Sequence, residues 1–126
     1  MRTWILCADN LCAKIFVKRT DEDRARLYYT IPGPRRNSRS RQNTKEFIRY
    51  VADEIELACG AGTDSQLILC AEKEMLSHFC KRFSGQVKGV LVGTVEQDLC
   101  NASQEYISTC SERILGVTAQ TSQRAA

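Results

Sequence analysis

The fold is decided by residues 4–18, which read WILCADNLCAKIFVK. Residues 3 to 8 are almost wholly apolar, which is typical of a strand buried on both faces near the centre of a sheet. Residues 11 to 18 place apolar side chains at every second position, as a half-exposed strand does. Asp9 and Asn10 favour a turn, because their side chains bond to nearby backbone groups. This stretch predicts a β-hairpin from which the rest of the sheet extends.

The remaining chain alternates between predicted strands and helices. Apolar alternation over residues 27–31 predicts a third strand, and Pro32 ends it. Apolar residues at helical spacing predict helices that begin at Asn43, near Glu72 and after Ser103, with Gly85 closing the second. Residues 66–71 and 87–95 are predicted strands. The order β-β-β-α-β-α-β-α predicts an α/β fold, a mixed sheet with packed helices in a single domain of residues 1–115, followed by a frayed polar tail of residues 116–126.

Composition excludes several classes of protein. The chain has 126 residues, of which 43% are hydrophobic, as in an ordinary globular domain. No apolar run approaches the roughly 20 residues that span a bilayer, and the N-terminus does not resemble a signal peptide. We therefore expect a cytoplasmic protein with no membrane association. Phosphate-binding loops, dinucleotide fingerprints and nucleophile elbows are absent from the sequence, so no cofactor is expected.

Seven cysteines are many for this length, but their spacing is irregular. Cys7 and Cys12 are separated by four residues, and no C-x-x-C motif occurs. Since His78 is the one histidine, the sequence predicts no metal site. We expect reduced thiols that pack as small apolar side chains. A disulfide between Cys7 and Cys12 is a less favoured alternative.

Positive charge is concentrated in the first half of the chain. Residues 1–50 contain twelve Lys and Arg against five Asp and Glu, about +7, whereas residues 51–126 contain six against ten, about −4. The segment from Pro32 to Gln42 carries no acidic side chain and is predicted to be an exposed loop. One interpretation is that its arginines contact RNA phosphates. The alternative is that the segment is a solvated loop that binds nothing. The predicted RNA-binding residues are Arg35, Arg36, Arg39 and Arg41, with Arg26 beside Tyr28 and Tyr29 as further cationic or stacking surface.

Asp9 follows the predicted central strand, and Asp98 follows a later one. The pair would bind a metal ion, as in nucleases with a ribonuclease-H-like topology. The favoured interpretation is that Asp9 forms the turn and Asp98 lies in the approach to the last helix. We therefore assign no catalytic residue.

Several short motifs resemble the bacterial host-attachment protein family. Members typically begin W-I-L-V-A-D, then turn, then continue A-R-[IL]-[FY], and this chain has WILCAD at residues 4–9 and AKIF at residues 13–16. The similarity continues through residues 67–99, where Asp98 and Leu99 stand at the family's D-L-T. The family is grouped with bacterial relatives of the middle domain of release factors and Pelota. The resemblance implies an α/β sandwich like those of ribosomal proteins, and a role at the ribosome.

This chain departs from that pattern in two ways. The Gly-Gly-Gln tripeptide with which release factors hydrolyse peptidyl-tRNA is absent, so that activity is not expected. The family's insert before the first long helix is shortened to residues 32–42. The leading hypothesis is a non-catalytic domain that binds the ribosome or a structured RNA through its basic loop. The alternative is a protein–protein or homo-oligomerisation module that docks through a sheet edge, and an enzyme centred on Asp9 ranks last.

Overall fold

A computed structural model describes the backbone of residues 2–9, 12–19, 24–32, 41–60 and 65–125; the side chains of residues 41–44, 60 and 116–125 lie outside the described part. Five strands form one sheet in the order β3-β2-β1-β4-β5. The strands are β1 (Arg2–Ala8), β2 (Cys12–Arg19), β3 (Arg26–Pro32), β4 (Ser65–Cys70) and β5 (Leu91–Val95). The helices are α1 (Arg41–Gly60), α2 (Lys73–Arg82), α3 (Gly85–Val90) and α4 (Gln104–Ala125). The predicted α/β fold with a mixed sheet is confirmed.

β1 is the centre of the sheet. It pairs antiparallel with β2 and parallel with β4, and its residues from Thr3 to Ala8 are all buried. The apolar run in the sequence is nearly continuous because side chains on both faces of β1 enter a core. The predicted hairpin and the central position of its first strand are both confirmed.

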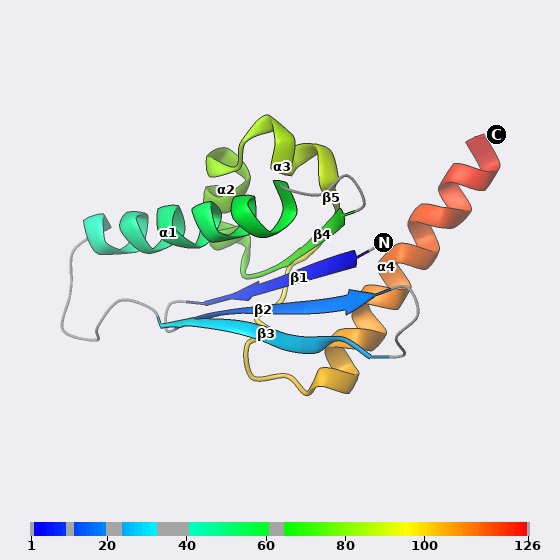
Figure 1. The fold of residues 1–126 in the computed structure, drawn as a ribbon, viewed down its shortest axis with the longest axis horizontal. Helices are drawn as coiled ribbons and strands as arrows, with labels where there is room; N and C mark the ends of the chain where they lie inside the picture. The colour runs from blue at the N-terminus through cyan, green and yellow to red at the C-terminus, as the bar shows by residue number, and fades with distance from the viewer. Residues whose placement is uncertain (1, 10–11, 20–23, 33–40, 61–64, 126) are drawn as a thin grey trace.

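Helices cover both faces of the sheet (Figure 1). Trp4, Leu6 and Ala8 pack in the larger core cluster with side chains of α1, α2 and α3. Ile5 and Cys7 point the other way, into a second cluster to which α4 contributes Ile107. The alternation along one strand therefore supplies two cores, and the domain has three layers.

Residues 87–95 do not form a single strand, so the predicted element order is wrong at this point. Residues 85–90 form α3, and the strand begins only at Leu91. The Ser84 hydroxyl accepts a hydrogen bond from the Val87 backbone N–H at 3.3 Å, which caps the helix, and Val87 is its buried residue. Gly85 accordingly begins α3, whereas the preceding helix already ends at Arg82. The valine-rich sequence suggested a longer strand because β-branched residues favour strands.

Two helix boundaries and the pattern of β3 also differ from the prediction. α1 begins at Arg41 and so includes two residues assigned to the loop, whereas residues 33–40 lie outside the described part. The backbone of α4 stays helical through Ala125, across the segment expected to fray. In β3 a bulge opposite Ile15 and Phe16 interrupts the alternation, because Ile15 pairs with Tyr29 and Phe16 with Leu27. Of the three apolar positions predicted to share one face, Ile31 is buried, whereas Leu27 and Tyr29 are exposed on this edge strand.

Substitution of Gly93 in β5 tests the packing of α4 on the sheet. A Cβ on Gly93 would lie 2.5 Å from Cγ2 of Ile114, which is a severe overlap. We expect Gly93→Ala to lower the free energy of unfolding by about 1–3 kcal/mol, as overpacking does. Ile114→Ala removes the obstructing methyl group, so the double variant should lose less than the sum of the two single losses. Urea unfolding measures all of these free energies.

Gly89→Ala is the matched control, because a Cβ on this glycine of α3 meets no atom within 4 Å. We expect this variant to be unchanged or slightly more stable, since alanine favours a helix. Equal losses for the two glycine variants would contradict the close approach of α4 to β5.

Candidate nucleic-acid interface

Three arginines meet at one end of the sheet, where β1 begins, β2 ends and β3 begins. The hairpin register pairs Arg2 with Arg19, and the next pair of strands places Arg26 opposite Val17. All three arginine side chains are exposed. Strand pairing therefore gathers charges that are as much as 24 positions apart in the sequence.

These arginines line a pocket of about 310 Å³. Trp4 and Tyr28 form part of its wall, with ring centroids 5.1 Å apart and planes at 78°, an edge-to-face arrangement. Trp4 is 4% exposed and packs in the core, whereas Tyr28 is 63% exposed and offers its ring to solvent. The described lining contains three guanidinium groups and no carboxylate. This combination suits an anion attached to a flat ring, as in a nucleotide.

The indole Nε1 of Trp4 is buried and has no hydrogen-bond partner among the described residues. A buried donor without a partner is costly, and proteins rarely leave one. It lies at a residue that lines the arginine pocket. Because this nitrogen is itself buried, the missing bond is a cost to the folded protein rather than a contact offered to a ligand.

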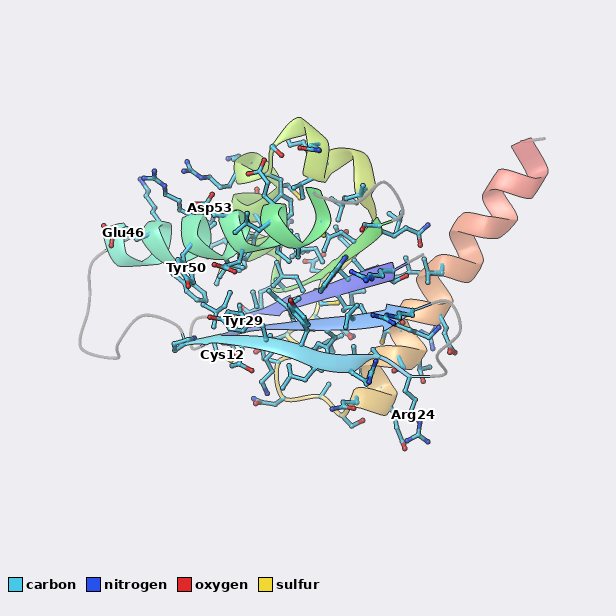
Figure 2. All side chains as sticks on the ribbon, in the orientation of Figure 1. Cys12, Arg24, Tyr29, Glu46, Tyr50 and Asp53 are labelled. Carbon is cyan, nitrogen blue, oxygen red and sulfur yellow. The ribbon has the colours of Figure 1, made fainter. Side chains whose placement is uncertain are left out.

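A second hollow of about 570 Å³ lies farther along β3, against α1. Tyr28 lines both hollows, and Tyr29, Leu57 and Glu54 line the second. Tyr29 of β3 and Tyr50 of α1 point toward each other (Figure 2), and a hydrogen bond between them raises the pKa of Tyr50. This hollow is aromatic with one carboxylate, so it suits bases or apolar side chains better than phosphates.

Of the predicted RNA-binding residues, only Arg26 has its side chain in the described part of the structure. Arg26 begins β3, whereas the arginine-rich segment follows the end of β3 at Pro32. Seven strand residues span about 20 Å. Arg35, Arg36 and Arg39 lie outside the described residues, and Arg41 begins α1 with its side chain outside them as well. Arg26 therefore lies with Arg2 and Arg19, at the opposite end of β3 from Pro32.

The sequence alone does not indicate Arg2 and Arg19 as site residues, because their pairing depends on the hairpin register. A two-residue turn at positions 9 and 10 would pair Arg2 with Val17. In the structure Ala8 pairs with Ala13, which moves Arg19 opposite Arg2. Two hydrogen bonds join Asp9 to Cys12 across this longer turn. Asp9 N–H donates to the Cys12 carbonyl at 3.0 Å, and Cys12 N–H donates to Asp9 Oδ1 at 2.8 Å. The turn role predicted for Asp9 is thereby confirmed.

The opposite end of the hairpin carries a cluster of cysteines and carboxylates. Asp98 Oδ1 accepts a hydrogen bond from Cys100 N–H at 3.1 Å, in the loop before α4. Burial, followed by the charges of Asp9 and its neighbours, raises the pKa of the Cys100 thiol. A hydrogen bond to Cys70 and burial raise the pKa of Cys7. All seven cysteines are free thiols, and His78 is exposed on α2.

Comparison with known proteins identifies the family. A family model described as "Protein required for attachment to host cells" matches residues 20–110. The chain belongs to this host-attachment family. No curated protein matches the sequence. No helix in the described part of the chain is both long and apolar enough to cross a membrane.

Solved structures share the fold of this family member. One, titled an archaeal protein, has 12% identity and a TM-score of 0.60, and the match covers 95% of this chain and 41% of that one. The crystal structure of the archaeal translation termination factor aRF1 has 14% identity and a TM-score of 0.61, with coverages of 95% and 42%. This host-attachment chain therefore spans about two fifths of the length of each of these proteins.

Replacement of Trp4 tests the state of its indole N–H. Trp4→Phe keeps a ring beside Tyr28 and removes the donor for which the described part of the chain offers no partner. We expect Trp4→Ala to cost about 3–5 kcal/mol of stability, and Trp4→Phe to cost less than half of that loss. Urea unfolding followed by circular dichroism measures both. Equal costs would mean that the N–H group makes a strong bond in the folded protein.

Proposed function

We propose that this host-attachment protein is a non-catalytic RNA-binding domain whose target is the ribosome or another structured RNA. The observation that carries the proposal is the arginine pocket, formed by Arg2, Arg19 and Arg26 around Trp4 and Tyr28. Guanidinium groups bind phosphates through paired N–H donors, and an exposed tyrosine stacks on a base. The proposal places the protein in the cytoplasm, where its target is found.

The arginine pocket lies at the start of β3, and the arginine-rich segment follows the last residue of β3, Pro32, in the sequence. The strand between them presents Tyr28 and Tyr29 to solvent. An RNA strand that follows β3 would meet the pocket first, then the tyrosines, and finally the segment that contains Arg35, Arg36, Arg39 and Arg41. Arginines at both ends would hold the backbone, and the rings between them would contact bases. Because these contacts are to the backbone and to the faces of bases, binding should not depend on the RNA sequence.

The fold shared with the translation termination factor aRF1 also supports a role in translation. The Gly-Gly-Gln tripeptide is absent from this sequence, so the proposal includes binding but not hydrolysis. The chain corresponds to about two fifths of that factor. We therefore propose RNA binding alone for this domain, and none of the other activities of the longer factor.

Salt dependence tests the pocket directly. The triple variant Arg2→Ala, Arg19→Ala, Arg26→Ala removes three positive charges from the arginine pocket. For a labelled single-stranded RNA, each phosphate contact contributes about −0.7 to the slope of log binding constant against log salt concentration, so the slope should become shallower by about 2. Binding should weaken evenly across RNA sequences. Fluorescence anisotropy at several salt concentrations measures the slope, and co-sedimentation tests purified ribosomes.

The matched control is Lys81→Ala, Arg82→Ala, Lys88→Ala, which removes the same charge from exposed positions on α2 and α3. It should keep the slope of the unmodified protein. The variant with alanine at Arg35, Arg36, Arg39 and Arg41 measures the contribution of the loop. If the unmodified protein binds neither RNA nor ribosomes at low salt, the proposal is wrong.

A second candidate function is supported by the edge strand. β3 is the outermost strand beside β2, and Leu27, Tyr28 and Tyr29 are all exposed on it. An apolar edge strand is a surface on which another chain can pair. A homo-oligomer or protein complex formed there would persist at high salt, whereas an RNA complex would dissociate. Light scattering at low and high salt distinguishes the two functions.

A further inference from the structure

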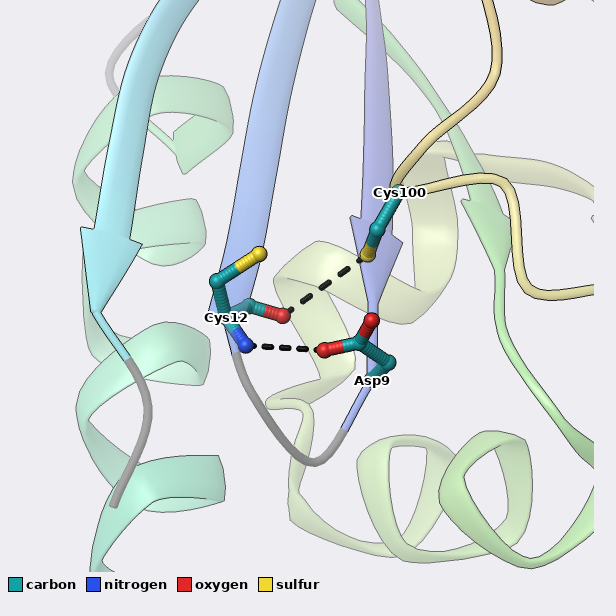
Figure 3. A group of neighbouring side chains, drawn as sticks. All are labelled: Asp9, Cys12 and Cys100. Carbon is teal, nitrogen blue, oxygen red and sulfur yellow. Dashed lines mark hydrogen bonds between the residues drawn. The ribbon is translucent and has the colours of Figure 1, made fainter. Parts of the chain in front are cut away.

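Two cysteines and an aspartate converge at the end of the hairpin opposite the arginine pocket. One oxygen of Asp9 and the sulfurs of Cys12 and Cys100 all lie within 4.8 Å of one another. Figure 3 shows the three side chains converging from three segments: the end of β1, the start of β2 and the loop between β5 and α4. Cys100 is buried, and the other two residues are half-buried. Such a site is enclosed by the protein and still reachable from solvent.

The backbone around the cluster holds these residues in place. Cys12 N–H donates to Asp9 Oδ1 at 2.8 Å, and the Cys100 thiol donates to the Cys12 carbonyl at 3.7 Å (Figure 3). Lys14 Nζ donates to the Cys100 carbonyl at 2.7 Å, which ties the loop after β5 to β2. Asp98 Oδ1 accepts from Cys100 N–H. The loop that carries Cys100 is therefore bound to the hairpin that carries Asp9 and Cys12.

We propose that Asp9, Cys12 and Cys100 bind a thiophilic divalent cation, for which zinc is the best fit. Zinc takes cysteine sulfur at about 2.3 Å and carboxylate oxygen at about 2.0–2.2 Å in a tetrahedral arrangement. From these lengths, neighbouring ligand atoms of a tetrahedral site are about 3.5–3.8 Å apart. A separation of at most 4.8 Å therefore closes to bonding geometry with shifts of about 1 Å. Calcium and magnesium prefer oxygen ligands, so a pair of sulfurs disfavours them.

Binding replaces an existing weak contact with a stronger one. Both thiols release their protons to solvent, and the Cys100 S–H bond to the Cys12 carbonyl is exchanged for a sulfur–metal bond. The Cys12 N–H stays on Asp9 Oδ1, and such a second hydrogen bond orients a ligating carboxylate. Three protein ligands leave the fourth tetrahedral position to water.

Sequence spacing does not reveal this site. Cys100 lies 88 positions beyond Cys12, and no short motif joins them. The fold brings them together because Asp9 and Cys12 flank the turn at the carboxyl end of β1, and Cys100 follows the carboxyl end of β5, which runs parallel to β1 through β4. The site is independent of the arginine pocket, since β1 separates the two by about 20 Å.

Metal content and cobalt absorption test the proposal. The full chain is stripped with a chelator, loaded with zinc or cobalt(II), passed through gel filtration and analysed for bound metal. We expect one metal per chain, and for cobalt the charge-transfer absorption of thiolate ligands. Cys12→Ser and Asp9→Asn should each weaken binding by more than about tenfold. Cys80→Ser, a half-buried thiol on α2 in the other core cluster, is the matched control and should bind normally.

Two readouts keep the outcome unambiguous. Circular dichroism establishes that each variant is folded, and Cys12→Ser is preferred to a change at buried Cys100 for this reason. Zinc should raise the melting temperature of the unmodified protein and of Cys80→Ser, but not that of Cys12→Ser. Absence of bound metal in the unmodified protein, absence of thiolate–cobalt absorption, or equal binding by Cys12→Ser would each overturn the proposal. RNA binding by Cys12→Ser should be unchanged, so the two proposals fail separately.

Discussion

The rest of the structure depends on the burial of β1 on both faces. Thr3 through Ala8 are buried, so one face of the strand meets α1, α2 and α3 while the other meets the layer of α4. The strand also has hydrogen-bonded neighbours on both edges, β2 and β4. The direction of these neighbours fixes where each functional group lies. The antiparallel hairpin sets the arginines at one end of β1, and the parallel pairing sets Cys100 near Asp9 at the other.

Much of the fold could be predicted from local patterns, because those patterns reflect burial. The apolar run of β1 and the helical stripe of α1 have a single interpretation, and both are confirmed: Val51 and Ile55 of that stripe are fully buried. Patterns with two interpretations gave errors. Val87, Val90 and Val92 suggested one strand, yet the Ser84 cap creates a short helix first. The bulge in β3 likewise depends on pairing with β2 and leaves no clear mark in the sequence.

The candidate sites were less predictable than the fold, since both form through long-range pairing. Arg26 was identified, but its partners Arg2 and Arg19 depend on a register that shifts by two residues with the length of the turn. The cluster at Asp9 joins residues whose sequence spacing matches no ligand motif. By contrast, the role of Asp9 in the turn was predictable, because it follows from a hydrogen bond three residues away. A contact between residues close in the sequence can be predicted from one sequence, whereas a site formed by distant residues can be found only once the pairing of the strands is known.

The parallel pairing of β1 with β4 also has a consequence for the order in which the chain is made. β1 and β2 emerge from the ribosome before the other strands of the domain, and β1 can pair with β2 as soon as the hairpin is complete. Its other edge finds a partner only after residues 65–70 have been synthesised and α1 has crossed the sheet. During that interval β1, which is buried from Thr3 to Ala8 in the folded domain, has unpaired backbone groups along one side. The nascent chain is therefore most exposed to misassociation with its neighbours before β4 arrives, and protection at this stage matters more than in the finished domain.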